Sequence, residues 1–308
     1  MGLASLYYLH GIYLPSGALL SELTDCSPSV NTEMLTGMAS GHPHPLFRGV
    51  RNQKPDASFT CHAVKQILDA VIAGGNNYAL DLSAGNTDLL YKQGQHLGFR
   101  YAAASSVHAR LRCAQAMLLW ETISATHQQD ASIACKLVAA YDGSNNPVVP
   151  AGTVALTGTP AATQFFTLGP VSINGTALHD EQSVSLASGV AVEEAGASGE
   201  TWNTYTGCKN TDPVLTVTAL GEPWDLRGLA GAAATSVVFY LRAKTDDGHN
   251  VADATASHIK ITASKGIILP EQVSGGGNDP TTTTLRIAIR ASDADTDPLT
   301  IDTAAAIT

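Results

Sequence analysis

The residues that come closest to a metal-binding pattern are histidines in the first quarter of the chain. His42 and His44 lie two positions apart, and Cys61 and His62 follow as an adjacent pair. Imidazole nitrogens and thiolates are the ligands that zinc prefers, and a zinc site needs about three or four of them at suitable spacings. No third ligand stands at a defined offset from the His42 and His44 pair. The sequence therefore predicts no metal at these histidines.

A second candidate site is the acidic run near the end of the chain. Asp293, Asp295 and Asp297 alternate like the opening of a calcium loop. An EF-hand loop also needs Gly at its sixth position and Glu at its twelfth, where this chain has Pro298 and Ala304. The pattern favours a solvated acidic turn before a terminal strand. The three aspartates remain weak calcium candidates, because the run also resembles the Asp-rich linkers of cadherin-like bacterial adhesin repeats.

Catalytic patterns are missing from the sequence. The adjacent carboxylates Glu193-Glu194 and Asp246-Asp247 would point to opposite faces of a strand, so neither pair could act on one substrate. No Gly-X-Ser-X-Gly nucleophile elbow occurs. The Gly-rich segment 275–278 lacks the Lys and the helix of a phosphate-binding loop. We therefore expect a protein that is not an enzyme and that uses no cofactor.

Most of the elements that must position these residues are predicted to be strands. Runs rich in Val, Thr and aromatic residues, separated by polar turns, are typical of an all-β protein. The predicted strands lie at 6–14, 97–104, 109–120, 133–141, 167–173, 184–186, 190–192, 214–220, 235–244, 258–263 and 283–290. The fold class that follows is mainly β, with sandwich-forming or barrel-forming sheets.

One amphipathic helix is expected over residues 62–73, packed on the outside of a sheet. Thr60 can act as its cap, and Gly74-Gly75 would stop it. Its apolar residues recur at helical spacing and form one stripe, which we expect to be buried: Val64, Ile67, Leu68, Val71 and Ile72.

Four other segments are expected to be turns, loops or an arm. Residues 28–58 contain two His-Pro steps, which disfavour a helix and predict an ordered loop or arm. Residues 74–98 are rich in Asn, Asp and Gly and predict a long connection. Residues 142–147 predict a turn, and residues 223–229 predict one helical turn that begins with proline.

Composition excludes several classes of protein. Charged residues make up only 14% of the 308 residues, and the net charge is −10. Residues 155–308 hold eight Lys and Arg against seventeen Asp and Glu, which argues against binding of nucleic acid by this half of the chain. Five cysteines without a CxxC pattern favour reduced thiols. Neither a signal segment nor an apolar run of ~18 residues is evident, so export and membrane spanning are not expected.

A family resemblance supplies a more specific expectation. The run Phe239–Arg242, an acidic turn, the His258–Thr262 strand and the Gly266 strand follow one another in the last quarter. In this order they resemble the carboxyl part of tail tube proteins of long-tailed bacteriophages. Upstream, residues 55–60 and the helix after them are similar to the strand-to-helix step of that family. The likeness lies in the order of the elements and not in a signature motif.

The resemblance implies a structural virion protein that forms stacked hexameric rings, and so the tail tube through which DNA leaves the virion. It implies self contacts within and between rings. It also implies contacts with the terminator, the tape measure and the baseplate side, and passage of DNA without specific binding. The location would be the virion tail, after synthesis in the bacterial cytoplasm. The alternative is a β-sandwich adhesin or carbohydrate-binding module that uses calcium.

The expected domain organisation is one assembly unit over residues 1–308. Within it, residues 142–200 are an insertion or outer decoration, because the chain is longer than the minimal tail tube fold requires. The alternative is a division into 1–141 and 148–308, on either side of the turn at 142–147.

Overall fold

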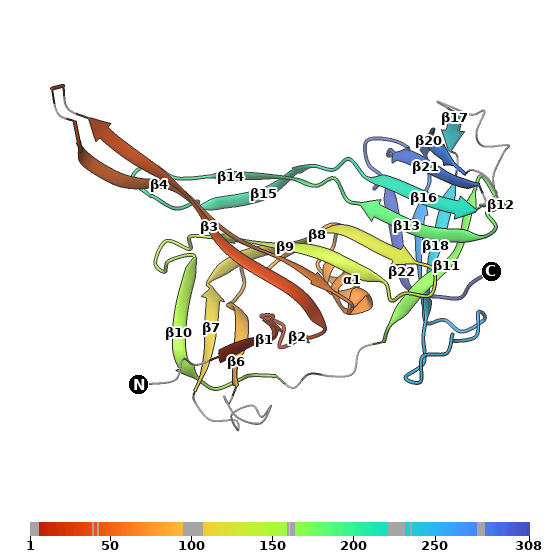
Figure 1. Cartoon of the computed structure of the whole chain (residues 1–308), viewed down its shortest axis with the longest axis horizontal. Helices are drawn as coiled ribbons and strands as arrows, with labels where there is room; N and C mark the ends of the chain where they lie inside the picture. The colour runs from red at the N-terminus through yellow and green to blue at the C-terminus, as the bar shows by residue number, and fades with distance from the viewer. Residues whose placement is uncertain are drawn as a thin grey trace.

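The computed structural model describes residues 6–38, 40–41, 43–94, 107–158, 160, 164–220, 232–234, 236–275 and 281–308. This part of the chain is mainly β, with several antiparallel sheets and a single helix, as the sequence predicts (Figure 1). The predicted strand at 97–104 and the predicted helical turn at 223–229 lie outside the described residues.

The largest sheet has ten strands and contains the central strands β8 and β9. Its order is β17 (Ala232–Ala234), β20 (Gly266–Ser274), β21 (Thr282–Ile289), β16 (Val214–Leu220), β13 (Glu181–Ala187), β8 (Gln115–Thr126), β9 (Ser132–Ala140), β4 (Pro45–Cys61) and β3 (Leu23–Met38), with β5 (Ala79–Asp81) also paired to β8. The sheet therefore joins segments from the whole length of the chain.

Two five-stranded sheets and one hairpin complete the structure. One sheet has the order β10 (Val148–Val154), β7 (His108–Cys113), β6 (Thr87–Gly94), β1 (Leu6–Tyr13) and β2 (Leu19–Leu20). The other has the order β12 (Thr176–Ala177), β11 (Phe166–Ile173), β18 (Val237–Ala243), β19 (His258–Ala263) and β22 (Leu299–Ala305). The hairpin is β14 (Ala191–Ala195) with β15 (Tyr205–Asn210).

One continuous hydrophobic core is shared by the three larger sheets and includes Trp120, Phe166 and Phe239. Alternation of the side chains explains how the strands contribute to it. In β16, for example, Leu215 and Val217 are buried, while the threonines between them are only partly covered. The many threonines in these strands thus supply half-covered faces that suit a pleated surface.

The single helix, α1 (Val64–Ala73), buries the stripe that its spacing predicts. Four of the five stripe residues are buried, and Ile72 is partly buried against the same core. The helix contacts β5 and β22, and its exposed side carries an ion pair between Lys65 and Asp69 at 2.7 Å. Gly75 follows its end with a φ of 86°, a conformation that glycine adopts without strain.

The predicted cap at Thr60 is wrong. Thr60 lies in β4 and pairs with Ala134 of β9, so the strand runs on to Cys61. The helix begins three residues later than the cap would require, after Ala63, which makes no side-chain capping bond. The thiol of Cys61 accepts a hydrogen bond from the Ala63 N–H at 3.3 Å instead. Strand pairing therefore takes precedence over the local capping signal.

The pairing of strands overturns two further predictions. Residues 74–98 were expected to be a connection, yet they contain β5 and β6, and Leu89 and Leu90 of β6 are buried. The Asn and Gly residues at 74–77 and 85–86 lie in the connections before β5 and before β6, whereas Gly94 is the last residue of β6. The predicted strand at 109–120 is two strands, because a bend at Ala114 separates β7 from β8 and sends them into different sheets.

Residues 142–200 are integrated into the sheets. They supply β10 to one five-stranded sheet, β11 to the other, and β13 to the interior of the ten-stranded sheet. In the part of the chain that the structure describes, no helix has the length and apolar character needed to cross a membrane.

Candidate assembly surface

The feature of the fold that points to function is a long antiparallel hairpin formed by β3 and β4. The two strands pair from Leu23 and Cys61 at one end to Met38 and Pro45 at the other. Only Asp56–Cys61 of β4 also pair with β9. Beyond that point the hairpin leaves the sheet and projects from the body (Figure 1). We call its projecting part, residues 28–38 and 45–55, the arm.

The arm carries an unusual share of exposed apolar side chains. Thirteen large hydrophobic residues are exposed in the described part of the chain, and seven of them lie on the arm: Val30, Met34, Leu35, Met38, Leu46, Phe47 and Val50. Their exposed fractions reach 65% at Met34. Scattered exposed hydrophobic residues are normal, but a contiguous group usually marks an interaction site.

The apolar side chains occupy both faces of the arm. Met34 lies directly opposite Val50 in the register, and Leu35 lies opposite Gly49. Successive side chains of a strand point to opposite faces, so these two pairs mark different faces. The side chain of Phe47 covers Gly49 and Gly37. A Cβ added at Gly49 would come within 3.0 Å of the ring, and one added at Gly37 would come within 3.3 Å of the Cβ of Phe47. The arm can therefore contact partners on two sides.

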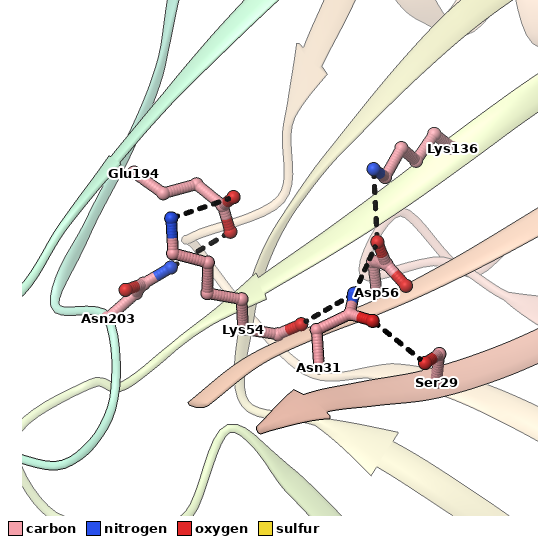
Figure 2. A network of polar contacts seen from close by, with 7 residues as sticks. All are labelled: Ser29, Asn31, Lys54, Asp56, Lys136, Glu194 and Asn203. Atoms are coloured by element: carbon pink, nitrogen blue, oxygen red, sulfur yellow. Dashed lines mark hydrogen bonds and ion pairs between the residues drawn. The ribbon is translucent and has the colours of Figure 1, made fainter. Parts of the chain in front are cut away.

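A polar network fixes the root of the arm (Figure 2). The Asn31 amide donates to the carboxylate of Asp56 at 3.3 Å and to the carbonyl of Lys54 at 3.4 Å. Lys136 of β9 pairs with the same Asp56 carboxylate at 3.0 Å. Because the Asp56 side chain is 16% exposed, these contacts are screened less than surface ion pairs are.

The β14–β15 hairpin supports the other side of the root, as Figure 2 also shows. Glu194 accepts a hydrogen bond from the Asn203 amide at 2.9 Å and pairs with Lys54 at 3.8 Å. The backbone N–H of Gln53 donates to the carbonyl of Thr201 at 2.9 Å. The arm is thus held from two sides at its root, while its apolar outer part stays uncovered within one copy.

The candidate zinc residues are not brought together. His42 lies outside the described residues, and His44 is exposed at the far end of the arm. Cys61 is buried at the opposite end of β4, where its thiol donates to the carbonyl of Ser21 at 3.2 Å. Burial raises the pKa of Cys61 to about 11, which keeps the thiol protonated. His62 contacts the carbonyl of Ala131 through Nδ1 at 2.9 Å.

The acidic run forms an exposed turn before the terminal strand β22, as the sequence predicts. The Thr296 hydroxyl and the Asp295 N–H donate to Asp293 at 2.9 Å and 3.0 Å, and these bonds lower the pKa of Asp293. Asp297 accepts a hydrogen bond from the Asn77 amide at 2.9 Å. The chain's own donors therefore occupy Asp293 and Asp297. Among the described residues, no group of three His, Cys, Asp or Glu is arranged to hold a metal ion.

The two pairs of adjacent carboxylates, Glu193-Glu194 and Asp246-Asp247, lie in different elements and have different surroundings. Glu193 is exposed and Glu194 is partly buried at the arm root, as expected for neighbours in a strand. Asp246 and Asp247 lie in an exposed turn, where the Thr245 hydroxyl donates to Asp247 and lowers the pKa of its carboxyl group.

The sequence predicts an ordered loop or arm over residues 28–58, but the structure places residues 28–38 and 45–58 in the paired strands β3 and β4. The apolar surface of these strands was also missed. The sequence did contain a signal for this apolar surface. Hydrophobic residues occur at positions 30, 34, 35, 38, 46, 47 and 50, and they do not alternate strictly with polar residues as they would in a half-buried strand. The sequence matches no family model, and no curated protein matches it. The candidate site therefore rests on geometry.

Proposed function

We propose that this chain is a structural subunit that assembles with copies of itself into stacked rings, as in the tail tube of a long-tailed bacteriophage. The observation that carries the proposal is the arm, whose seven exposed large hydrophobic side chains project from the body on a rigid root. Such an exposed apolar surface would lower the solubility of a lone monomer, whereas a partner subunit would cover it.

Open sheet edges support the same proposal. The five-stranded sheets end at β10 and β2 and at β12 and β22 within the described residues. Edge strands present unpaired backbone groups that another chain can bind. Together with the arm, these edges would let one subunit bind more than one neighbour, as a stacked ring requires.

The resemblance described above supplies the specific form of the assembly. Hexameric rings, contacts with the terminator, tape measure and baseplate side, location in the virion tail, and DNA passage without specific binding are all part of the proposal on that basis. The acidic balance of residues 155–308 fits a conduit for a polyanion, because like charges prevent adhesion of the phosphates.

Replacement of Phe47 by serine tests the role of the arm. Purified wild-type protein should form rings or tubes of uniform bore in negative-stain images, and light scattering should give the mass of a multimer. Phe47→Ser should shift the protein towards monomer, because the largest apolar side chain at the outer arm is lost. Phe47→Leu keeps an apolar side chain and should still assemble.

Folding must be unchanged in these variants for the comparison to hold. Phe47 is 56% exposed and lies outside the core, so both variants should melt at the wild-type temperature. A wild-type protein that remains monomeric at every concentration would contradict the proposed function. Equal assembly by Phe47→Ser and wild type would contradict the role of the arm.

A further inference from the structure

An apolar groove of about 300 Å³ lies at the root of the arm. It is lined by Pro28, Val30 and Pro55 of the arm and by Leu111 and Val148 of β7 and β10. Trp202, which bridges to Gln53 of the arm, also lines it. Asp56 is the one charged residue that lines it, and that carboxylate is already paired with Lys136. The groove is therefore suited to an apolar side chain and offers little to a charged or sugar ligand.

The outer arm presents side chains of the kind that such a groove accepts. Leu46 and Phe47 are 64% and 56% exposed, and an aromatic or aliphatic anchor in a pocket is the usual centre of a stable interface. Within one copy these side chains cannot reach the groove, because the arm extends away from its own root (Figure 1). A second copy brings the two surfaces together.

Charge favours the same pairing. The β14–β15 hairpin and its connecting loop, residues 191–210, hold Glu193, Glu194 and Glu200 against Lys209. Glu193 and Glu200 are exposed, and Trp202 of the same loop lines the groove. The outer arm carries the exposed cation Arg48 near Phe47. Attraction between Arg48 and the exposed Glu193 and Glu200 of this hairpin would favour the pairing and help to set its register.

We propose that the groove at the arm root of one copy receives the outer arm of the next, with Phe47 and Leu46 as the anchors. This inference rests on the proposed function, because it names the surface that the arm uses in self-assembly. The contact joins two different surfaces of the same chain, so every added copy leaves one arm and one groove free. Such a head-to-tail contact extends a stack and does not stop at a dimer.

Photo-crosslinking from position 47 tests the docking site. The full chain is made with p-benzoyl-phenylalanine at position 47, mixed with wild-type protein labelled with ¹⁵N, and irradiated, and the crosslinked peptides are identified by mass spectrometry. We expect intermolecular crosslinks to peptides that contain Val30, Val148 or Trp202. The same photoreactive residue at position 269, which is exposed on β20, should not label these peptides.

The outcomes separate this inference from the proposed function. Crosslinks from position 47 to another surface of a second copy would overturn the groove and leave self-assembly intact. A wild-type protein that is monomeric and gives no intermolecular crosslinks would overturn both proposals.

A groove-filling variant gives a second measurement. Val30 is exposed and its side chain lines the groove, so Val30→Trp should occupy it without disturbing the core. We expect the concentration for half-assembly to rise by about tenfold or more, as the loss of one anchor contact predicts. Ser58→Trp is the matched control, because Ser58 is also exposed on this hairpin but does not line the groove. Equal assembly by the two variants would overturn the inference.

Discussion

At the scale of single residues, two buried polar side chains, Asp88 and His108, form hydrogen bonds inside the fold. Asp88 is 5% exposed and accepts two hydrogen bonds from Arg112 at 2.7 Å and 2.8 Å. His108 is fully buried, and its Nδ1 accepts the backbone N–H of Gln93 at 3.1 Å. A ring that accepts at Nδ1 carries its proton on Nε2 and is neutral. These groups serve the fold, and they make its stability depend on pH.

We predict that His108 weakens the fold in mild acid. Burial, and then the charge of Lys92, lowers the pKa of His108 in the folded chain. In the unfolded chain the ring titrates near pH 6.5, so as the pH falls below about 6.5 the unfolded state binds the proton first and the fold loses stability. His108→Gln should therefore flatten the decrease in melting temperature between about pH 7 and 5.

The control for this prediction is His127→Gln, because His127 is exposed. That variant should show the same dependence of melting temperature on pH as wild type. An unchanged slope in His108→Gln would show that the buried ring does not contribute.

We predict that metal removal leaves the fold unchanged. Asp293 and Asp297 already accept hydrogen bonds from Thr296 and Asn77, whereas calcium requires about six to eight oxygen ligands free to bind it. Thermal melts with a strong chelator and with added calcium should superimpose. A decrease in melting temperature on chelation that calcium restores would instead support the calcium-dependent adhesin alternative.

At the scale of elements, α1 is stabilised by the core that it covers. An isolated helix of 10 residues is marginal in water, so burial of its apolar stripe must hold it in place. Leu68 is fully buried in the centre of that stripe. The arm is the opposite case, because its outer part is held by cross-strand bonds and by its root. The chain covers the apolar stripe of the helix, whereas it leaves the apolar side chains of the outer arm exposed.

We predict that Leu68→Asp prevents the subunit from accumulating in folded form, since it places an unpaired carboxylate in the core. Leu68→Ala should still fold but lower the free energy of unfolding by about 2 to 5 kcal/mol. Chemical denaturation measures this loss. Asp69→Ala, which alters the exposed face, should cost at most about 1 kcal/mol. Normal folding of Leu68→Asp would refute the helix assignment.

At the scale of the whole molecule, charge is unevenly distributed along the chain. Residues 155–308 hold eight Lys and Arg against seventeen Asp and Glu, so many carboxylates have no cation to pair with. In a ring each of these is repeated by symmetry, and mutual repulsion makes such a surface costly unless function requires it. A negatively charged passage for DNA would give these charges a role.

We predict that the inner wall of the assembly is net acidic and is drawn mainly from residues 155–308. The assembled protein should then show no measurable affinity for double-stranded DNA at moderate salt, because binding depends on release of counterions by Lys and Arg. A filter-binding or anisotropy titration tests this. Salt-sensitive DNA binding by the intact assembly, or an inner wall rich in Lys and Arg, would contradict the prediction even if tubes form.

The sequence by itself determined what depends on local patterns. The strands at 214–220 and 258–263 have the predicted bounds, because their alternation of apolar and polar residues is strong and their turns are marked. The helix stripe was also readable, since five apolar residues recur at its period. The acidic turn before the terminal strand followed from an Asp-rich run that ends at Pro298.

Only the tertiary structure decided what depends on pairing between distant segments. Thr60 has the chemistry of a helix cap, yet β9 recruits it into β4. Residues 87–94 become a strand because β1 and β7 flank them, and the bend at Ala114 divides β7 from β8 between two sheets. The exposed apolar surface of the arm was not predicted for the same reason. Hydrophobic residues in a strand are normally assigned to a core, and only the fold shows that those of the arm extend beyond it.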